Sequence, residues 1–188
     1  MIRTFVAIEM PPAVRDSIGT LEVELRSLPV RVSWVRPGNI HLTLKFLGEI
    51  DSAQVELISD ALTRVGARTP SFTLSVETLG FFPNGRRPRV VWVGIREPNG
   101  DLERLAKAVE KELSPLGFQK EKRGFSPHLT FGRIRDGRNS DQIVEAVRKI
   151  HFEPQRVLVR EMVFMKSTLT SRGSIYEPLK RIAFSKSK

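Results

Sequence analysis

The tetrapeptide HLTL at residues 41–44 recurs as HLTF at residues 128–131. The chain has only three histidines, His41, His128 and His151, and two of them begin this repeated pattern. A repetition of this kind indicates an internal duplication of the chain. Both copies alternate polar and apolar residues, which is typical of a strand with one buried face.

Strand geometry predicts what each copy presents. Side chains at positions i and i+2 lie on the same face of a strand. His41 and Thr43 therefore share one face of the first strand, and His128 and Thr130 share one face of the second. The apolar residues of both copies point to the core. If the two half-chains pack as pseudo-symmetric lobes, we expect the two His/Thr pairs to face each other across a cleft.

Strand and helix patterns alternate along the rest of the chain. Strands are expected at 2–8, 31–35, 39–47, 71–82, 89–95, 127–134, 156–165 and 174–184. Helices are expected after Pro11 and Pro12, behind the capping box formed by Asp51 and Gln54, from Asp101 to near Gly117, and from Asn139 to Ile150. The order predicts an α+β or α/β protein built as two lobes.

Composition narrows the class of protein. Apolar residues make up 40% of the 188, the formal net charge is +10, and there is no cysteine. The absence of cysteine excludes disulfides, a thiol nucleophile and cysteine-ligated zinc. The positive charge favours an anionic partner, with RNA or DNA first. No apolar run approaches the roughly 18 residues of a membrane helix, so we expect a cytoplasmic protein without a membrane partner, and a monomer by default.

Two facing His/Thr pairs suit phosphate ester chemistry without a metal. A neutral imidazole can take a proton from the attacking oxygen, and an imidazolium can give one to the leaving oxygen. Threonine hydroxyls can donate to the non-bridging phosphate oxygens. A purely structural role for each histidine is one alternative, and a metal site is another, although two histidines with no neighbouring carboxylate are few ligands for zinc or iron. The sequence contains no P-loop and no dinucleotide-binding glycine fingerprint.

The paired His-x-Thr motifs resemble those of the two-histidine (2H) phosphoesterases. Within that superfamily the chain is most similar to the RNA 2′,3′-cyclic phosphodiesterases, also called 2′-5′ RNA ligases. The resemblance covers nearly the whole chain and includes RTFVAIEMP, NIHLTLKFLGEI, FFPNGRRPRVVWVGI, SPHLTFGRI and KSTLTSRGSIYEPL. It implies a single 2H domain over 1–188, with two pseudo-symmetric lobes that each carry one motif. It also implies an α+β fold in which two antiparallel-type sheets face a central cleft, with helices outside.

The resemblance further implies an activity and its residues. The expected reaction is hydrolysis of an RNA 2′,3′-cyclic phosphate end to a 2′-phosphomonoester, on tRNA fragments or other cleaved RNA, with no cofactor and no metal. It assigns His41 as proton donor and His128 as proton acceptor. Thr43, Thr130 and Arg133 are then expected to bind the phosphate. Arg133 follows His128 by an odd offset, so this role needs a bend near Gly132.

Other basic residues are candidates for RNA binding. By the period of two, Lys45 falls on the His41 face. Arg86, Arg87 and Arg89 crowd one turn, which favours a contact with the RNA backbone over a solvated loop. The alternative at each position is a solvated charge.

The remaining singular residues are interpreted more simply. Phe46, Trp34 and Trp92 are expected in the core, with stacking on an RNA base as the alternative. His151 is expected to be structural or exposed. By resemblance alone, the segment 166–168 and Tyr176 are candidates to line the cleft.

Two other functions stay open from the sequence. One is an RNA 2′-5′ ligase in tRNA or other RNA processing. The other is an RNA-binding module without turnover, which would need positive charge and stacking rather than a paired acid and base.

Overall fold

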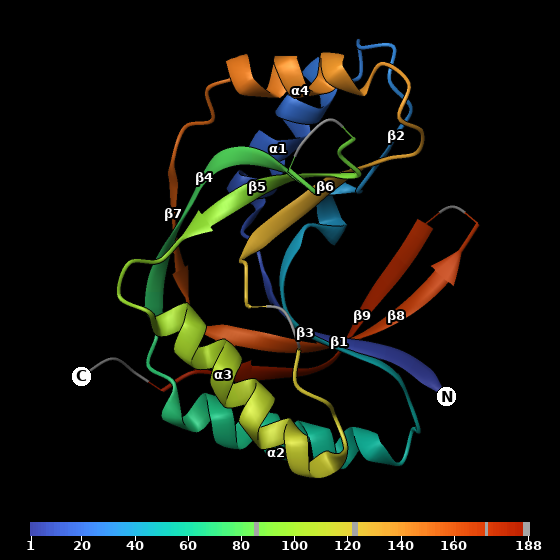
Figure 1. Cartoon of the computed structure of the whole chain (residues 1–188). Helices are drawn as coiled ribbons and strands as arrows, with labels where there is room; N and C mark the ends of the chain where they lie inside the picture. Colours follow the sequence, from blue (N-terminus) through green and yellow to red (C-terminus); the bar gives the residue numbers. More distant parts are fainter. Residues whose placement is uncertain (85–86, 122–123, 172, 186–188) are drawn as a thin grey trace.

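Two antiparallel sheets form the framework of the molecule. The computed structural model describes residues 1–84, 87–121, 124–171 and 173–185. Within these residues all strand pairs are antiparallel, and the helices lie outside the sheets (Figure 1). The expected α+β class with two facing sheets is confirmed.

The four-stranded sheet carries the first motif. Its order is β3-β1-β8-β9. These strands are β1 (Ile2–Glu9), β3 (His41–Ile50), β8 (Glu161–Thr170) and β9 (Gly173–Ala183). His41 is the first residue of β3, which forms one edge of this sheet.

The five-stranded sheet carries the second motif. Its order is β2-β6-β5-β4-β7. These strands are β2 (Val32–Trp34), β4 (Phe72–Phe82), β5 (Val90–Arg96), β6 (His128–Ile134) and β7 (Gln155–Val159). His128 begins β6, just as His41 begins β3. The strands β3 and β6 contact each other, so the two motifs lie where the sheets meet.

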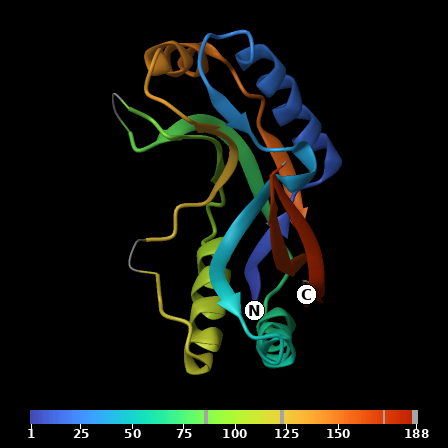
Figure 2. The same cartoon turned by 90° about the vertical axis from the view of Figure 1, so that its right-hand side faces the viewer.

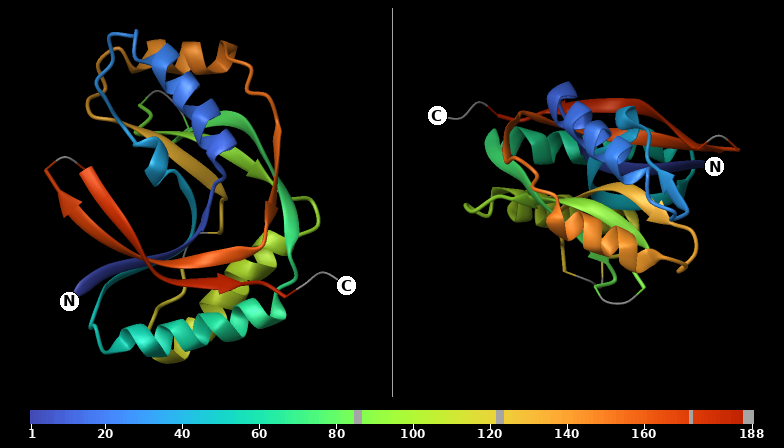
Figure 3. Two further views of the ribbon diagram at one scale, coloured as in Figure 1. Left: turned by 180° about the vertical axis from the view of Figure 1, so that it is seen from behind. Right: turned by 90° about the horizontal axis from the view of Figure 1, so that it is seen from above.

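Helices lie at both ends of the molecule. They are α1 (Pro12–Leu25), α2 (Gln54–Arg68), α3 (Asp101–Leu113) and α4 (Ser140–Lys149), with short 3₁₀ turns at Pro37–Asn39 and Ser114–Leu116. Figures 2 and 3 show α1 and α4 at the end formed by the five-stranded sheet, and α2 and α3 at the other. One half of the expected capping box is present before α2, where the Asp51 amide donates to Gln54 Oε1 at 3.0 Å, while Asp51 Oδ1 accepts from the Ala53 amide rather than from that of Gln54.

The two lobes are not the two half-chains. Strands β1 and β3 come from the first half and pair with β8 and β9 from the end of the chain. The five-stranded sheet likewise combines β2 and β4 with β5, β6 and β7. Each lobe therefore contains strands from both halves, which differs from the simple packing of one half against the other.

One expected strand is two strands. The run 156–165 was predicted as a single strand, but β7 ends at Val159 in one sheet and β8 begins at Glu161 in the other. Arg160 lies between them, and its carbonyl accepts a hydrogen bond from the Phe184 amide at 2.7 Å. Both strands are rich in apolar residues, so the sequence pattern continues through a point where the chain changes sheets.

The main core lies on the sheet faces turned away from the motif histidines. Leu42 and Leu44 of β3 and Leu129 and Phe131 of β6 are at most 5% exposed and belong to it. A second, smaller cluster lies on the His41 face of the four-stranded sheet. It consists of Phe5, Ala7, Val163 and Met165, with Tyr176 packed against it.

Candidate active site

His41 is held by its own backbone and by aromatic rings. Its Nδ1 lies 2.7 Å from the carbonyl oxygen of Asn39, two residues earlier. The imidazole stacks on Phe5 with ring centroids 4.8 Å apart, and the ring of Tyr176 meets it edge-on at 5.2 Å. Asn39 is itself fixed, because its Nδ2 donates to the Ser174 carbonyl at 2.7 Å. The ring of His41 is thus positioned on three sides.

His128 is held in the same way. Its Nδ1 lies 2.8 Å from the carbonyl oxygen of Ser126, again two residues earlier. Phe82 meets the imidazole edge-on, with ring centroids 4.9 Å apart, and Trp92 lies at 6.3 Å. The two halves of the site therefore repeat one arrangement: a histidine at the start of a strand, a backbone carbonyl on Nδ1, and aromatic rings around the imidazole.

The contact to Nδ1 decides which ring nitrogen is available for proton transfer. A carbonyl oxygen only accepts hydrogen bonds, so Nδ1 of each ring carries the proton in that contact. Nε2 of each ring is then left to accept or donate a proton. Two imidazoles with the same free nitrogen can act as an acid and a base on one substrate.

The two threonines lie beside the histidines, as alternation predicts. Thr43 is opposite Ala7 in β1, and His41 is opposite Glu9, so both point to the face that carries the small apolar cluster. Thr130 is opposite Trp92, on the face of the His128 ring. Both threonines are half-buried, and their hydroxyls can donate to an anion placed between the motifs.

A β-bulge follows each motif at the same position. In the β1–β3 pair the register shifts between Thr43 and Lys45, and in the β5–β6 pair it shifts between Thr130 and Gly132. A bulge adds one residue to a strand and reverses the alternation beyond it. The residue five places after each histidine therefore returns to the histidine face.

In β6 this bulge brings Arg133 to the His128 face. Arg133 is opposite Val90, which shares its face of β5 with Trp92. Its side chain is exposed. The bend expected near Gly132 is the observed register shift, and it places a guanidinium on the surface that also carries His128 and Thr130.

In β3 the bulge overturns two expectations. Lys45 does not lie on the His41 face: it is 3% exposed, and its Nζ donates to Glu110 Oε1 at 2.5 Å and to the Gln119 carbonyl at 2.8 Å. It is thus unavailable to an RNA phosphate. Phe46 is not in the core: it is 59% exposed and lies 6.2 Å from Phe5, the ring that stacks on His41. An unbroken alternation had assigned both residues to the wrong face.

Burial changes the acid–base properties of His41. Removal from water lowers the pKa of His41 below its ordinary value of 6.5, and the Asn39 carbonyl and the charge of Glu9 oppose this shift in part. The neutral imidazole is therefore favoured in the free protein. An anion bound nearby would favour the imidazolium instead.

The other candidate residues lie in several parts of the molecule. Arg86 lies outside the described residues, while Arg87 and Arg89 are exposed just before the start of β5. Trp34 and Trp92 are half-buried, with Trp34 stacked on Phe131. His151 is exposed, as expected, with Nε2 3.1 Å from Glu153.

The segment 166–168 lies on β8, opposite Tyr176 and its neighbours on β9. The Lys166 ammonium there is paired with Glu177 at 3.0 Å. Tyr176 itself contacts His41, so of these candidates it is the one that reaches a motif histidine.

Among the described residues, no three His, Asp or Glu side chains gather in a group that could hold a metal ion.

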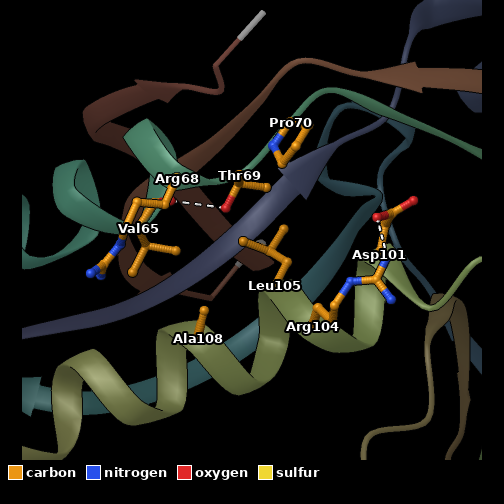
Figure 4. Close-up of a pocket in the computed structure, with 8 residues that line it drawn as sticks. All are labelled: Val65, Arg68, Thr69, Pro70, Asp101, Arg104, Leu105 and Ala108. Atoms are coloured by element: carbon orange, nitrogen blue, oxygen red, sulfur yellow. Dashed lines mark hydrogen bonds and ion pairs between the residues drawn. The ribbon is translucent and has the colours of Figure 1, made fainter. Parts of the chain in front are cut away.

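A pocket of about 160 Å³ opens between the end of α2 and the start of α3 (Figure 4). Its arginines are paired, Arg68 with Glu112 and Arg104 with Asp101, and neither motif histidine lines it.

No helix in the described part of the chain is both long and apolar enough to cross a membrane.

Two antiparallel sheets that each offer a His-x-Thr strand at their junction have the architecture of a two-histidine phosphoesterase. Comparison with known proteins agrees. The family model described as "LigT like Phosphoesterase" matches the chain twice, over residues 8–92 and 93–176, and each match contains one motif. The chain belongs to the LigT-like phosphoesterase family.

Individual relatives cover almost the whole chain. An RNA 2′,3′-cyclic phosphodiesterase of Archaeoglobus fulgidus is 37% identical over 95% of this chain and 98% of its own length. One of Thermotoga maritima is 34% identical over 97% of this chain and 96% of its own. Among solved structures, Escherichia coli LigT complexed with 3′-AMP superposes with a TM-score of 0.78 at 28% identity, covering 98% of both chains.

Proposed function

We propose that this protein hydrolyses the 2′,3′-cyclic phosphate at the end of an RNA strand to a 2′-phosphomonoester, without a metal ion. The observation that carries the proposal is the repeated geometry of His41 and His128, each with Nδ1 on a backbone carbonyl and Nε2 left for proton transfer. The names of the full-length relatives, RNA 2′,3′-cyclic phosphodiesterases, support the same substrate.

The reaction then needs one base and one acid. His128 Nε2 takes a proton from water as the water oxygen attacks phosphorus. The bond between phosphorus and O3′ breaks, and His41 Nε2 gives its proton to O3′. The phosphate stays on O2′, and the 3′-hydroxyl is freed. The assignment of His41 as donor and His128 as acceptor follows the resemblance to the family.

The environment of His41 is compatible with the role of an acid. Burial lowers its pKa, so its imidazolium gives up a proton more readily than an exposed one. The negative charge of a bound cyclic phosphate offsets this effect and favours the protonated ring before reaction. The two influences shift the pKa of His41 in opposite directions, and an acid transfers its proton most effectively when its pKa lies near the working pH.

The phosphate itself would be held by three side chains. The Thr43 and Thr130 hydroxyls would donate to the non-bridging oxygens, which gain charge in the transition state. Arg133, on the His128 face, would neutralise that charge with a planar guanidinium. These roles need no group beyond the side chains of the chain.

The experiment uses all three histidines. His41→Ala and His128→Ala are each expected to lower kcat on an oligonucleotide with a 2′,3′-cyclic phosphate end by about 10²–10⁴. His151→Ala is the matched control, because His151 is 79% exposed and lies outside the site; it should keep wild-type turnover. Wild-type turnover by either motif variant would overturn the two-histidine mechanism.

A further inference from the structure

The His128 face of the five-stranded sheet continues past Arg133 to a second group of basic residues. Ser33 of β2 is opposite Arg133 of β6. One step outward along the face, the Arg135 amide donates to the Arg31 carbonyl at 2.8 Å, which extends the same antiparallel ladder. Residues two apart share a face, so Arg31, Ser33 and Arg135 lie on the side of Arg133 and His128. We call these three residues the distal arginine surface.

The distal arginine surface is oriented but not neutralised. Arg135 Nε donates to Ser33 Oγ at 2.5 Å, a contact with an uncharged partner that leaves the positive charge in place. Among the described residues, no carboxylate oxygen lies within 4.0 Å of the Arg135 guanidinium. Arg31 is 79% exposed, and its carboxylate neighbour Asp136 is 3.9 Å away. Asp136 also lies 3.8 Å from Arg138, so one acidic group is shared by two arginines.

A groove adjoins this surface at the edge of the sheet. It encloses about 340 Å³ and is lined by Arg26, Val30, Arg31, Val32, Ser33, Trp34 and Arg135. The Arg26 guanidinium lies over the Trp34 ring, 5.9 Å from its centroid. Arg26 is also paired with Glu22 at 2.5 Å, and Trp34 stacks on Phe131 of the main core. Arg31 and Arg135 therefore supply the positive charge that the backbone of a single-stranded nucleic acid needs.

Distance excludes the reacting phosphate as the ligand of this surface. Arg135 lies seven positions after His128, just beyond the end of β6, which corresponds to about 20 Å. A phosphate at Arg135 therefore belongs to a nucleotide upstream of the cyclic end. The Cα atoms of Arg133 and Arg135 are about 7 Å apart, a spacing of the order of one nucleotide in an extended strand.

We infer that the distal arginine surface and its groove bind the phosphodiester backbone of single-stranded RNA upstream of the reacting end. This inference rests on the proposed function, because it takes the cyclic end to lie at His41 and His128. It assigns a direction to the RNA, from the junction of the sheets outward along β6 to the edge strand β2. It also makes an oligonucleotide, rather than a single nucleotide, the preferred substrate.

The test compares a long and a short substrate. One is a pentaribonucleotide with a 2′,3′-cyclic phosphate end, and the other is a nucleoside 2′,3′-cyclic phosphate. The ratio of their kcat/KM values is expected to fall about fivefold in Arg135→Gln and further in Arg31→Gln/Arg135→Gln. Arg148→Gln is the control, because Arg148 is exposed on α4, whose buried residues join the main core on the other face of the sheet. It removes the same charge and should keep the wild-type ratio.

A binding measurement separates this inference from the proposed function. Fluorescence anisotropy would report the affinity for a labelled pentaribonucleotide ending in a 2′-phosphate, over a series of salt concentrations. Each lost phosphate contact should reduce the slope of log K against log salt by about 0.7. The inference would be overturned if the double variant kept the wild-type ratio and slope. It would also be overturned if Arg148→Gln lowered the ratio as much as the double variant does. A wild-type protein that binds the strand but turns over neither substrate would overturn the proposed function alone.

Discussion

A backbone contact orients the imidazole rings of His41 and His128 and leaves Nε2 of each ring available for proton transfer. The alternation of polar and apolar residues does not predict this contact. In each motif the backbone carbonyl two residues before the histidine accepts from Nδ1. The sequence does predict which face each ring and its threonine partner share, because the period of two holds through both tetrapeptides. It does not predict the carbonyl contacts, since these depend on a backbone turn that precedes the strand.

The pKa of His41 has a consequence for stability. Because burial lowers the pKa in the folded state, the unfolded chain, with a value near 6.5, binds the proton more tightly. Folding stability is therefore fully retained above about pH 6.5 and decreases as the pH falls below that value toward the folded-state pKa. Thermal denaturation between pH 7.5 and 5.5 should show a larger decrease in Tm for the wild type than for His41→Gln. An equal decrease in both proteins would show that His41 is not the titrating group.

Phe46 is far more exposed than its residue type and strand position predict. It lies 59% exposed on the His41 face. Stacking of a base on such a ring is worth about 1–3 kcal/mol, so Phe46→Ala should raise KM for RNA about tenfold with little change in Tm. Phe46→Trp should restore KM, and Val23→Ala, at an exposed apolar residue of α1, serves as control. Unaltered KM in Phe46→Ala would remove the ring from the substrate site.

At the level of the elements, the two β-bulges explain both the correct and the incorrect expectations. Most strand boundaries follow from alternating patterns, although the break at Arg160 does not, and α2 begins at Gln54, the second member of the Asp51/Gln54 pair. The odd offset of Arg133 signals a bend, because an exposed arginine would otherwise fall on the core face. In β3 the same odd offset falls on a phenylalanine, which fits a core position equally well. The period of two therefore misassigned Phe46 and Lys45 without any conflict in the sequence.

The bulge in β3 is accompanied by a buried ion pair. Lys45, with a side chain 2% exposed, connects β3 to Glu110 of α3 and to the Gln119 carbonyl in the segment before β6. Removing one partner of a buried pair costs about 3 kcal/mol, because the other charge is left without a partner. Lys45→Met should therefore lower Tm by roughly 6–12 °C.

The double variant Lys45→Met/Glu110→Leu provides the matched comparison for that change. It removes both charges, so it should recover much of the lost stability in the same thermal denaturation. A Lys45→Met protein as stable as the wild type would show that the pair contributes nothing net, and a double variant no better than Lys45→Met would point to packing rather than charge.

On the scale of the whole molecule, the exchange of strands between lobes is what brings the motifs together. The chain enters the four-stranded sheet with β1 and β3 and returns to it with β8 and β9 after building the five-stranded sheet. The repeated motif predicts two similar lobes, and two facing sheets are present. Which strands belong to which lobe was not predictable, because local patterns contain no information about long-range pairing. For the same reason, the sequence does not predict the change of sheet at Arg160.

In the proposed reaction, paired histidines hydrolyse the cyclic phosphate without a metal ion and leave the phosphate on O2′. The most direct measurement incubates the wild-type protein with an RNA oligonucleotide ending in a 2′,3′-cyclic phosphate in excess EDTA and determines which hydroxyl of the product bears the phosphate. The proposed mechanism predicts turnover in EDTA and a product with a 2′-phosphate end. Turnover that requires a divalent ion would contradict the metal-free mechanism, and a 3′-phosphate end would contradict the departure of O3′ with the proton of His41.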